Sequence, residues 1–508
     1  MITSVARLLQ RRRIAQIKRF DNEAKAIQEE QLRKLVAIGY RTQYGKAHEM
    51  KPQCTYQEFA DALPIAGYDV LQPWIERTLK GETDILWPGR TKYFAQSAGT
   101  TQAKQKVIPI SNESLRTIHF RGGFDSVASY IAQNPQSRYF NNRSLVIGAG
   151  CPQPDAQGNQ VAQLSGILMQ HLPLIGQCVR LPSAAISRIE NFTEKIQLAT
   201  EETITKRISN FSGIPTTYLT FFHHALEITG KQNALEIWPD LELFIHGGIS
   251  FAPYHEQFKT LIPSPQMHYM EVYNASEGFF ALQSDLNDPS MLLMLDYGIF
   301  YEFIPLKEID DPHPSVLPLW EVEVGNSYAI VITTNSGLWR YMIGDVVTFT
   351  STNPYKIIIS GRTKHFINIC GEELMVGQAD LALQRCCATH HAEVRDYTVT
   401  AQHPTPSGKI RHQWLIEFTT PPASLNAFAT SLDHELCNVN FDYECKRSGD
   451  IFMEPLELTA TEPGLLNKWL SNNNRLGGQS KIPRLSEQRT LYNELLELND
   501  TLKAQRQP

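Results

Sequence analysis

The chain has no apolar run as long as the roughly 18 residues that a membrane-spanning helix needs, so we expect no integral membrane segment. Its N-terminal segment also lacks the apolar core of about 7 to 15 residues that marks a secretory signal. That segment is basic instead, with Arg11-Arg12-Arg13 and Lys18-Arg19 among alanines, isoleucines and leucines. The pattern favours the solvated face of an amphipathic helix, and contact with a membrane surface is the alternative.

Cysteine is scarce and scattered, with eight in 508 residues and no Cys-x-x-Cys pair. This spacing predicts neither a disulfide framework nor a zinc site. It favours a cytoplasmic protein whose thiols are mostly small buried residues. The pairs His223-His224 and His390-His391 predict no metal site either, because adjacent residues on a helix point away from each other and no matching ligand set lies near them.

An excess of positive charge is absent as well. The 47 lysines and arginines are outnumbered by 53 aspartates and glutamates, which gives a formal net charge of −6. Proteins that bind nucleic acid present a basic surface, so we expect no nucleic-acid partner. With 508 residues, 42% of them hydrophobic, the chain can bury sizeable cores, and its length predicts two or three domains.

The chain lacks a Walker A motif, because the Gly-Lys pair at 230–231 is followed by glutamine rather than by the hydroxyl residue that holds magnesium. A different loop, residues 96–106, combines hydroxyls, a glycine and lysines after an aromatic and apolar run. Glycine lets backbone N–H groups approach an anion, hydroxyls add donors and lysine neutralises charge. We call residues 96–106 the phosphate loop, and a polar turn between two strands is the alternative interpretation. Its candidate contacts are Ser97, Gly99, Thr100, Thr101 and Lys106.

Three later motifs supply what else a nucleotide needs. Tyr273, Ser276 and Glu277 place a ring for a purine, a hydroxyl and a possible magnesium ligand within five residues. Asp345 follows a glycine after an apolar run, where a carboxylate can accept both ribose hydroxyls. Arg362 ends a strand-like run, where a guanidinium could reach ribose or the α-phosphate. Taken singly, Glu277 also fits a surface carboxylate, Asp345 a turn residue and Arg362 an ion-pair partner.

Together the four motifs resemble the acyl-adenylate-forming superfamily of acyl-CoA synthetases, luciferases and peptide-synthetase adenylation domains. Within that superfamily the chain is most similar to the GH3 family of acyl acid amido synthetases. The phrases with this similarity are Gly-Gly-Ile-Ser-Phe-Ala-Pro-Tyr at 247–254, Gly-Leu-Trp-Arg-Tyr-Met-Ile-Gly-Asp at 337–345, residues 366–374, and Gly-Gly-Gln-Ser-Lys-Ile-Pro-Arg-Leu at 477–485. The resemblance spans nearly the whole chain.

The resemblance and the periodicity both indicate an α/β fold. We expect a large N-terminal adenylate-forming domain at 1–360, with sheets, flanking helices and a β-rich subdomain, and a smaller mobile α+β C-terminal domain at 361–508. Periodicity predicts helices over 5–60, 194–207 and 378–389, and strands at 144–147, 241–245, 321–324, 328–333, 397–400 and 414–418.

For the nucleotide and acyl substrates, the resemblance implies a role for each candidate. The phosphate loop would hold the triphosphate. Gly247 and Gly248 would line the adenine and acyl side, and Tyr273 would lie against the base. Ser276 would help to hold the phosphate or the acyl carboxylate.

The resemblance also implies roles for the charged candidates. Glu277 would bind Mg²⁺, and Asp345 would bind ribose with Arg362 beside it. Lys364 falls where the superfamily has its interdomain hinge. Lys481 resembles the mobile C-terminal lysine that reaches the substrate carboxylate and the α-phosphate during adenylation.

The implied function is that of an ATP-dependent ligase. The carboxylate of a small acid would attack the α-phosphate of ATP and release pyrophosphate, after which an amine, expected to be an amino acid, would expel AMP and form an amide. ATP and Mg²⁺ are the implied cofactors, and Lys106, Glu277 and Lys481 would stabilise charge. An acyl-CoA ligase and a non-catalytic nucleotide or acyl sensor are the alternatives. The acid, the amine and the oligomeric state stay open.

The acyl pocket is the least determined part of the expected site. We expect it to be lined from residues 115–130, 218–222 and 251–254, whose aromatic side chains would suit an apolar or ring-containing acid. Aromatic residues at helical spacing also fit a plain hydrophobic core, which is the alternative interpretation.

Overall fold

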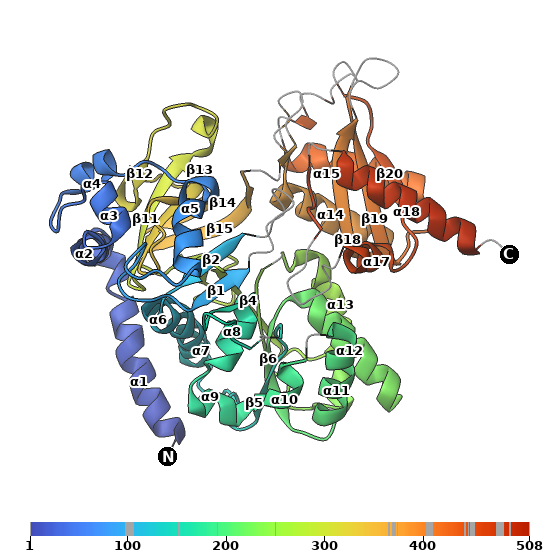
Figure 1. The fold of residues 1–508 in the computed structure, drawn as a ribbon. Coiled ribbons are helices and arrows are strands. Elements are labelled where there is room, and N and C mark those ends of the chain that lie inside the picture. Colours follow the sequence, from blue (N-terminus) through green and yellow to red (C-terminus); the bar gives the residue numbers. More distant parts are fainter. Residues whose placement is uncertain are drawn as a thin grey trace. The chain divides into compact units, whose positions relative to one another are not determined.

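The computed structural model forms two compact units (Figure 1). The first unit consists of Met1–Gly248 and Ile262–Ile358, and the second of Ile249–Leu261 and Ile359–Pro508. The structure describes residues 2–96, 106–150, 153–189, 191–248, 250–363, 366–367, 372, 374–402, 410–440, 443–444, 447, 453–473, 482–486 and 489–506. Within these residues, no helix combines the length and the apolar character needed to cross a bilayer.

The first unit begins with helices, as the periodicity predicts. Thr55 shows why one of them starts where it does, because its hydroxyl accepts from the Glu58 backbone while the Glu58 carboxylate accepts from the Thr55 backbone, a capping box. The N-terminal helices are α1 (Ile2–Ile17), α2 (Phe20–Gly39), α3 (Gln43–Ala47), α4 (Tyr56–Ala62) and α5 (Tyr68–Leu79).

Arg13 corrects the expectation of a solvated basic face on α1. Arg11 and Arg12 are exposed, but Arg13 is buried and donates to Asp125 at 2.8 Å and to Asp296 at 2.6 Å. Asp125 lies on α7 (Arg121–Gln133), so the third arginine of the basic run holds α1 against α7.

A large twelve-stranded sheet is the main feature of the first unit. Its order is β12-β11-β13-β14-β15-β10-β9-β8-β7-β6-β3-β5, with parallel pairing from β8 to β5 and antiparallel pairing among the other strands whose registers are described. The last part of β15 belongs to the second unit. The strands are β3 (Arg143–Val146), β5 (Arg180–Leu181), β6 (Ile208–Gly213), β7 (Leu243–His246), β8 (His268–Ala275), β9 (Gly278–Leu282), β10 (Met291–Leu293), β11 (Ile299–Pro305), β12 (Leu317–Pro318), β13 (Ser327–Thr334), β14 (Tyr341–Thr352) and β15 (Tyr355–Arg362).

A three-stranded sheet, β2-β1-β4, carries the two ends of the phosphate loop. Antiparallel β1 (Tyr93–Gln96) and β2 (Val107–Ile110) pair Gln96 with Val107, so the loop connects the two strands of a hairpin. β4 (Gln160–Gln163) runs parallel to β1. The other helices of this unit are α6 (Asn112–Ser114), η1 (Leu115–Phe120), α8 (Leu164–Gln170), α9 (Leu174–Val179), α10 (Ala184–Ser187), α11 (Phe192–Thr203), α12 (Pro215–Thr229), η2 (Ala234–Glu236), η4 (Leu306–Glu308) and η5 (Leu319–Glu321).

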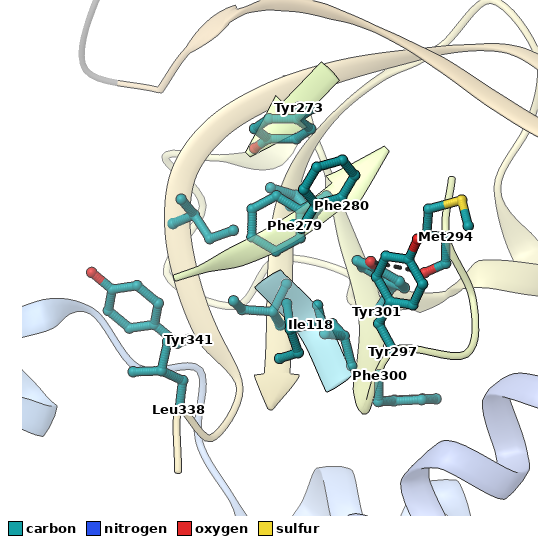
Figure 2. Close-up of a cluster of buried hydrophobic side chains, with 14 of the residues drawn as sticks. Ile118, Tyr273, Phe279, Phe280, Met294, Tyr297, Phe300, Tyr301, Leu338 and Tyr341 are labelled. Carbon is teal, nitrogen blue, oxygen red and sulfur yellow. Dashed lines mark hydrogen bonds between the residues drawn. The ribbon is translucent and has the colours of Figure 1, made fainter. Parts of the chain in front are cut away.

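Aromatic side chains fill the core of the first unit. Figure 2 shows Phe279 and Phe280 of β9 beside Tyr273 of β8, with Tyr297 and Tyr301 in the same cluster. The rings of Tyr273 and Phe280 are 4.8 Å apart. These contacts join the parallel and antiparallel parts of the sheet at the point where β8 meets β9.

The second unit is a smaller mixed module. Antiparallel β18 (Glu393–Gln402) and β19 (Arg411–Thr420) are extended by β20 (Glu457–Ala460), which is parallel to β19. Tyr397 and Trp414 stack across β18 and β19 with ring centroids 5.3 Å apart. The other elements are η3 (Ala252–Tyr254), α13 (His255–Leu261), β16 (Phe366–Ile367), β17 (Leu374–Met375), α14 (Val376–His390), α15 (Leu425–Val439), α17 (Leu465–Asn472) and α18 (Thr490–Arg506).

The predicted α/β class is confirmed, and most of the predicted helices and strands are present at or near their expected positions. The strand predicted at 321–324 is wrong. Leu319–Glu321 is a 3-10 turn, and the two valines do not share a face, since Val322 is 7% exposed and Val324 is 56% exposed. Four alternating residues are too few to specify a strand.

Two smaller expectations also need correction or explanation. Most cysteines are expected to be buried, yet of the five described ones only Cys386 is buried, and Cys178 is exposed.

Gly230, the first residue of the false Walker motif, has φ of +66° and ends α12, so it is a left-handed helix cap.

Candidate functional site

A short hydrogen bond joins two of the predicted nucleotide-binding residues. The Tyr273 hydroxyl donates to Asp345 Oδ2 at 2.6 Å, the length of a charge-assisted bond. Tyr273 lies on β8 and Asp345 on β14. In the sheet order, these two strands are separated by three others, β15, β10 and β9. The sheet therefore curls enough to bring residues of non-adjacent strands into contact.

The position of Asp345 follows from a bulge in β14. Ala329 pairs with Val346 and Val331 with Met342, so the three residues Ile343–Asp345 oppose the single residue between them on β13. Gly344 has φ of +93°, a conformation that glycine adopts without strain. The Gly-Asp dipeptide thus creates the irregularity that turns the carboxylate out of the regular ladder.

Ser276 and Glu277 form the turn between β8 and β9. Ala275 and Gly278 pair directly, which makes this a two-residue hairpin. Glu277 is only 8% exposed although turn residues are usually solvated, and Ser276 is partly exposed. The alternative of a surface carboxylate is therefore wrong for Glu277. The hairpin brings this buried carboxylate and the Tyr273 hydroxyl into one local element.

Gly247 and Gly248 follow the carboxyl end of β7. A Cβ at Gly247 would lie 2.4 Å from the Val272 carbonyl oxygen, so no larger residue fits against β8. Gly248 has φ of +82°. In parallel sheets the carboxyl ends of strands are where ligands collect, and both glycines lie at that edge.

Glu271 is a titratable residue near this edge that the sequence interpretation missed. It pairs in register with His246, the last residue of β7, and lies two residues before Tyr273 on β8. Burial raises the pKa of its carboxyl from an ordinary 4.5 to about 7. A single glutamate in an apolar strand gives no sequence signal, because only the fold determines whether water surrounds it.

His119 is a second missed residue, on the segment expected to line the acyl pocket. It lies in η1, a π-helix that leads into α7. Burial lowers the pKa of its imidazole to about 4, so the ring is neutral at pH 7. Insertions of π-helix often mark functional segments.

Residues 218–222 are part of the hydrophobic core, as the plain alternative predicts. Tyr218 and Phe221 are fully buried, and the Tyr218 hydroxyl lies 2.9 Å from the Leu145 carbonyl oxygen. Phe221 stacks on Trp238 with centroids 5.5 Å apart.

The remaining predicted residues are distributed over both units. Lys106 precedes β2, and its ammonium lies 5.6 Å from the centroid of the Tyr68 ring. Arg362 is partly buried at the end of β15, in the second unit. The predicted residues outside the described part of the chain are Ser97, Gly99, Thr100, Thr101, Lys364 and Lys481. Within the described part, no cluster of three or more His, Cys, Asp or Glu side chains could hold a metal ion.

Models of known families match three consecutive parts of the chain. The GH3 family N-terminal domain matches residues 13–267, the central domain 292–362 and the C-terminal domain 377–490. The chain belongs to the GH3 family. The resemblance predicted from the motifs is confirmed.

Two curated relatives of this GH3 protein come from plants. Indole-3-acetic acid-amido synthetase GH3.3 of Arabidopsis thaliana is 22% identical, over 90% of this chain and 89% of the relative. Jasmonoyl–L-amino acid synthetase GH3.5 of Oryza sativa subsp. japonica is 23% identical, over 91% and 92%.

Solved structures share the fold of this GH3 protein. GH3.15 acyl acid amido synthetase superposes with a TM-score of 0.78 at 16% identity, covering 96% of this chain and 95% of that one. A 2-hydroxyisobutyryl-CoA ligase in the postadenylation state gives a TM-score of 0.60 at 14% identity, covering 94% and 92%. The GH3 protein thus has the architecture of adenylate-forming enzymes.

Proposed function

We propose that this GH3 protein is an ATP-dependent acyl acid amido synthetase that adenylates a carboxylic acid and transfers the acyl group to an amino acid. The observation that carries this proposal is the contact between Tyr273 and Asp345, in a chain whose relatives are amido synthetases. A family match alone leaves a degenerate, ligand-binding member possible, whereas an intact polar site supports an enzyme.

The residues present fit ATP and Mg²⁺ chemically. Asp345 is an oxygen acceptor for ribose hydroxyls, and the bond from Tyr273 fixes its orientation. Glu277 is a buried carboxylate of the kind that Mg²⁺ binds together with phosphate oxygens and water. Bound MgATP supplies an electrophilic α-phosphorus and a pyrophosphate leaving group.

The protein residues then act by position and charge. Lys106 and Lys481 neutralise the negative charge that accumulates when the carboxylate meets the α-phosphate. The phosphate loop holds the triphosphate, Arg362 contacts the ribose or α-phosphate, and Lys364 serves as a hinge between domains 1–360 and 361–508. An adenylated acid is an activated anhydride, so an amine attacks its carbonyl carbon and AMP leaves with no covalent enzyme intermediate.

The molecule that accepts the acyl group distinguishes this proposal from the alternatives. One relative is named an amido synthetase and the other a jasmonoyl–L-amino acid synthetase, which supports an amino acid, although the fold is shared with a CoA ligase. A sensor would bind ligand without turnover. Cysteine spacing supports a cytoplasmic location for the enzyme.

Carboxylate-dependent exchange of pyrophosphate into ATP tests the adenylation step. We expect exchange with at least one member of a panel of aryl, indolyl and aliphatic acids in the presence of Mg²⁺, without amine or coenzyme A. Adding amino acids to the responsive acid should then produce an amide and AMP, and adding coenzyme A should produce no thioester.

Matched variants make the result specific to the site. Asp345→Asn should abolish most exchange, while Asp285→Asn, at an exposed turn position, should leave it unchanged. Retained ATP binding with no exchange on any acid would favour the sensor, and thioester formation would favour the ligase.

A further inference from the structure

The chain segment that follows Gly247-Gly248 belongs to the second unit, although β7 before it belongs to the first. Within the second unit, η3 of this segment packs against α14 and β18. The amide of Gln257 on α13 donates to the Val394 carbonyl at 3.1 Å. A segment that begins next to the proposed acyl side is thus built into the module that carries Lys481.

Tyr254 is the residue of this segment that contacts the C-terminal motif. Its side chain is 1% exposed, and its hydroxyl accepts a hydrogen bond from Arg484 Nη2 at 3.1 Å. Arg484 comes from the Lys-Ile-Pro-Arg phrase, three residues after Lys481.

The Arg484 guanidinium is held from several directions. Nη1 donates to Asp380 Oδ1 on α14 at 2.6 Å, and Nε lies 3.6 Å from Asp396 Oδ1 on β18. The guanidinium carbon lies 5.1 Å from the centroid of the Tyr397 ring. The side chain is 10% exposed, so these contacts replace most of its hydration.

The backbone around Arg484 is fixed to the edge of β18. Thr398 Oγ1 donates to the Pro483 carbonyl at 2.7 Å, the Val399 amide donates to the Arg484 carbonyl at 2.7 Å, and the Ser486 amide donates to the Val399 carbonyl at 3.0 Å. These bonds tie residues 483–486 to β18 along its edge.

We propose that Arg484 is a positioning residue for Lys481, and that its bonds to Asp380 and Tyr254 place the lysine segment and the segment after Gly247-Gly248 as one body. The inference rests on the proposed function, in which Lys481 acts during adenylation. A lysine reaches its target by a flexible side chain, so its effectiveness depends on where its backbone is held. Arg484 anchors a segment that follows Lys481 closely in the chain, and Tyr254 relates this anchor to the segment after Gly247-Gly248.

Removing a single hydroxyl tests this coupling. Tyr254→Phe retains the buried ring and deletes only the acceptor for Arg484. Arg484→Lys keeps the positive charge near Asp380, but a lysine cannot offer the two guanidinium donors that reach Asp380 and Tyr254. We expect each variant to lower kcat for pyrophosphate exchange about 10-fold, the effect of one hydrogen bond to a charged group, with KM for ATP little changed. The kcat of the double variant should be no lower than that of either single variant.

Two controls separate positioning from general damage. Tyr443→Phe deletes an equally buried hydroxyl in the same unit, bonded to Asp433 at 2.7 Å, and should leave exchange unchanged. Transfer from a chemically prepared acyl-adenylate to the amine should be retained in Tyr254→Phe, because Lys481 acts before that step, whereas a misfolded module would lose both steps.

The outcomes are distinct. Wild-type exchange together with unchanged exchange in Tyr254→Phe would overturn the positioning role alone. Additive losses in the double variant, or equal losses of adenylation and transfer, would also overturn it. A wild-type protein without exchange on any acid would overturn the proposed function and this inference with it.

Discussion

The hydroxyl of Tyr273 and the carboxylate of Asp345 meet at 2.6 Å although three strands separate them in the order of the sheet. The contact depends on two irregularities of the backbone. Gly344 allows the bulge that carries Asp345, and the curl of the sheet brings β8 toward β14. Asp345, the proposed ribose acceptor, is thus held by a tyrosine that is itself part of the aromatic core (Figure 2).

Tyr273→Phe should weaken ATP binding more than it weakens the fold. Asp345 would lose the donor that fixes its orientation, so we expect KM for ATP to rise about 10-fold, the effect of one charge-assisted bond. Tyr328→Phe is the matched control, because Tyr328 lies on β13, a different strand from Tyr273 and Asp345, and its buried hydroxyl accepts from the Glu323 amide at 3.0 Å. Steady-state kinetics of both variants make the comparison, and equal KM values would contradict a role for the bond.

Gly122→Ala and Gly123→Ala should have opposite effects on stability. A Cβ at Gly122 would lie 2.2 Å from Phe279 Cγ, whereas one at Gly123 would meet nothing within 4 Å. Overpacking at the first position should lower the free energy of unfolding by about 1–3 kcal/mol. The second change should raise it by up to about 1 kcal/mol, because alanine favours a helix. Urea unfolding of the two variants measures the difference, and similar values would argue against the close approach of α7 to β9.

Glu271→Gln should change how stability depends on pH. The folded-state pKa of about 7 lies above the ordinary value of 4.5, so the folded protein binds more protons between these values. The free energy of unfolding of the wild type therefore decreases as pH rises from 4.5 to 7, by an amount on the order of 1–3 kcal/mol. Glutamine does not ionise, and the variant should gain stability relative to wild type at pH 8 compared with pH 5. A constant difference across this range would contradict the raised pKa.

Arg13→Gln should destabilise the first unit, while Arg12→Gln should not. Burial raises the pKa of Asp125, and the charge of Arg13 opposes that rise. Removing Arg13 leaves Asp125 and Asp296 without this partner, which should cost about 3–5 kcal/mol of unfolding free energy. Arg12 is exposed, and its replacement should change stability by no more than about 0.5 kcal/mol. Equal melting temperatures for the two variants would show that α1 does not depend on the buried pair.

The sequence predicted the family and the α/β fold because whole phrases and long periodic runs survive in it. It also placed Tyr273, Ser276 and Glu277 in one local group, since these residues are close in the chain, but it did not predict the hairpin that carries them. The roles assigned to the site residues stay predictions.

Properties that depend on distant contacts could not be predicted in this way. Arg13 looked solvated because its partners Asp125 and Asp296 are 112 and 283 residues away. The burial of Glu271 and the bond between Tyr273 and Asp345 likewise follow from how strands curl and pack. Nothing in the sequence near Tyr254 indicates that it contacts Arg484, 230 residues further along.

The insertion of Ile249–Leu261 into the second unit affects how this protein can be divided. Because that unit is discontinuous in the chain, a fragment starting at residue 359 would leave Arg484 without its tyrosine acceptor, and a fragment ending at 358 would carry η3 and α13 without the elements they pack against. A chimera that exchanges C-terminal modules between GH3 relatives therefore needs to exchange the short internal segment with them.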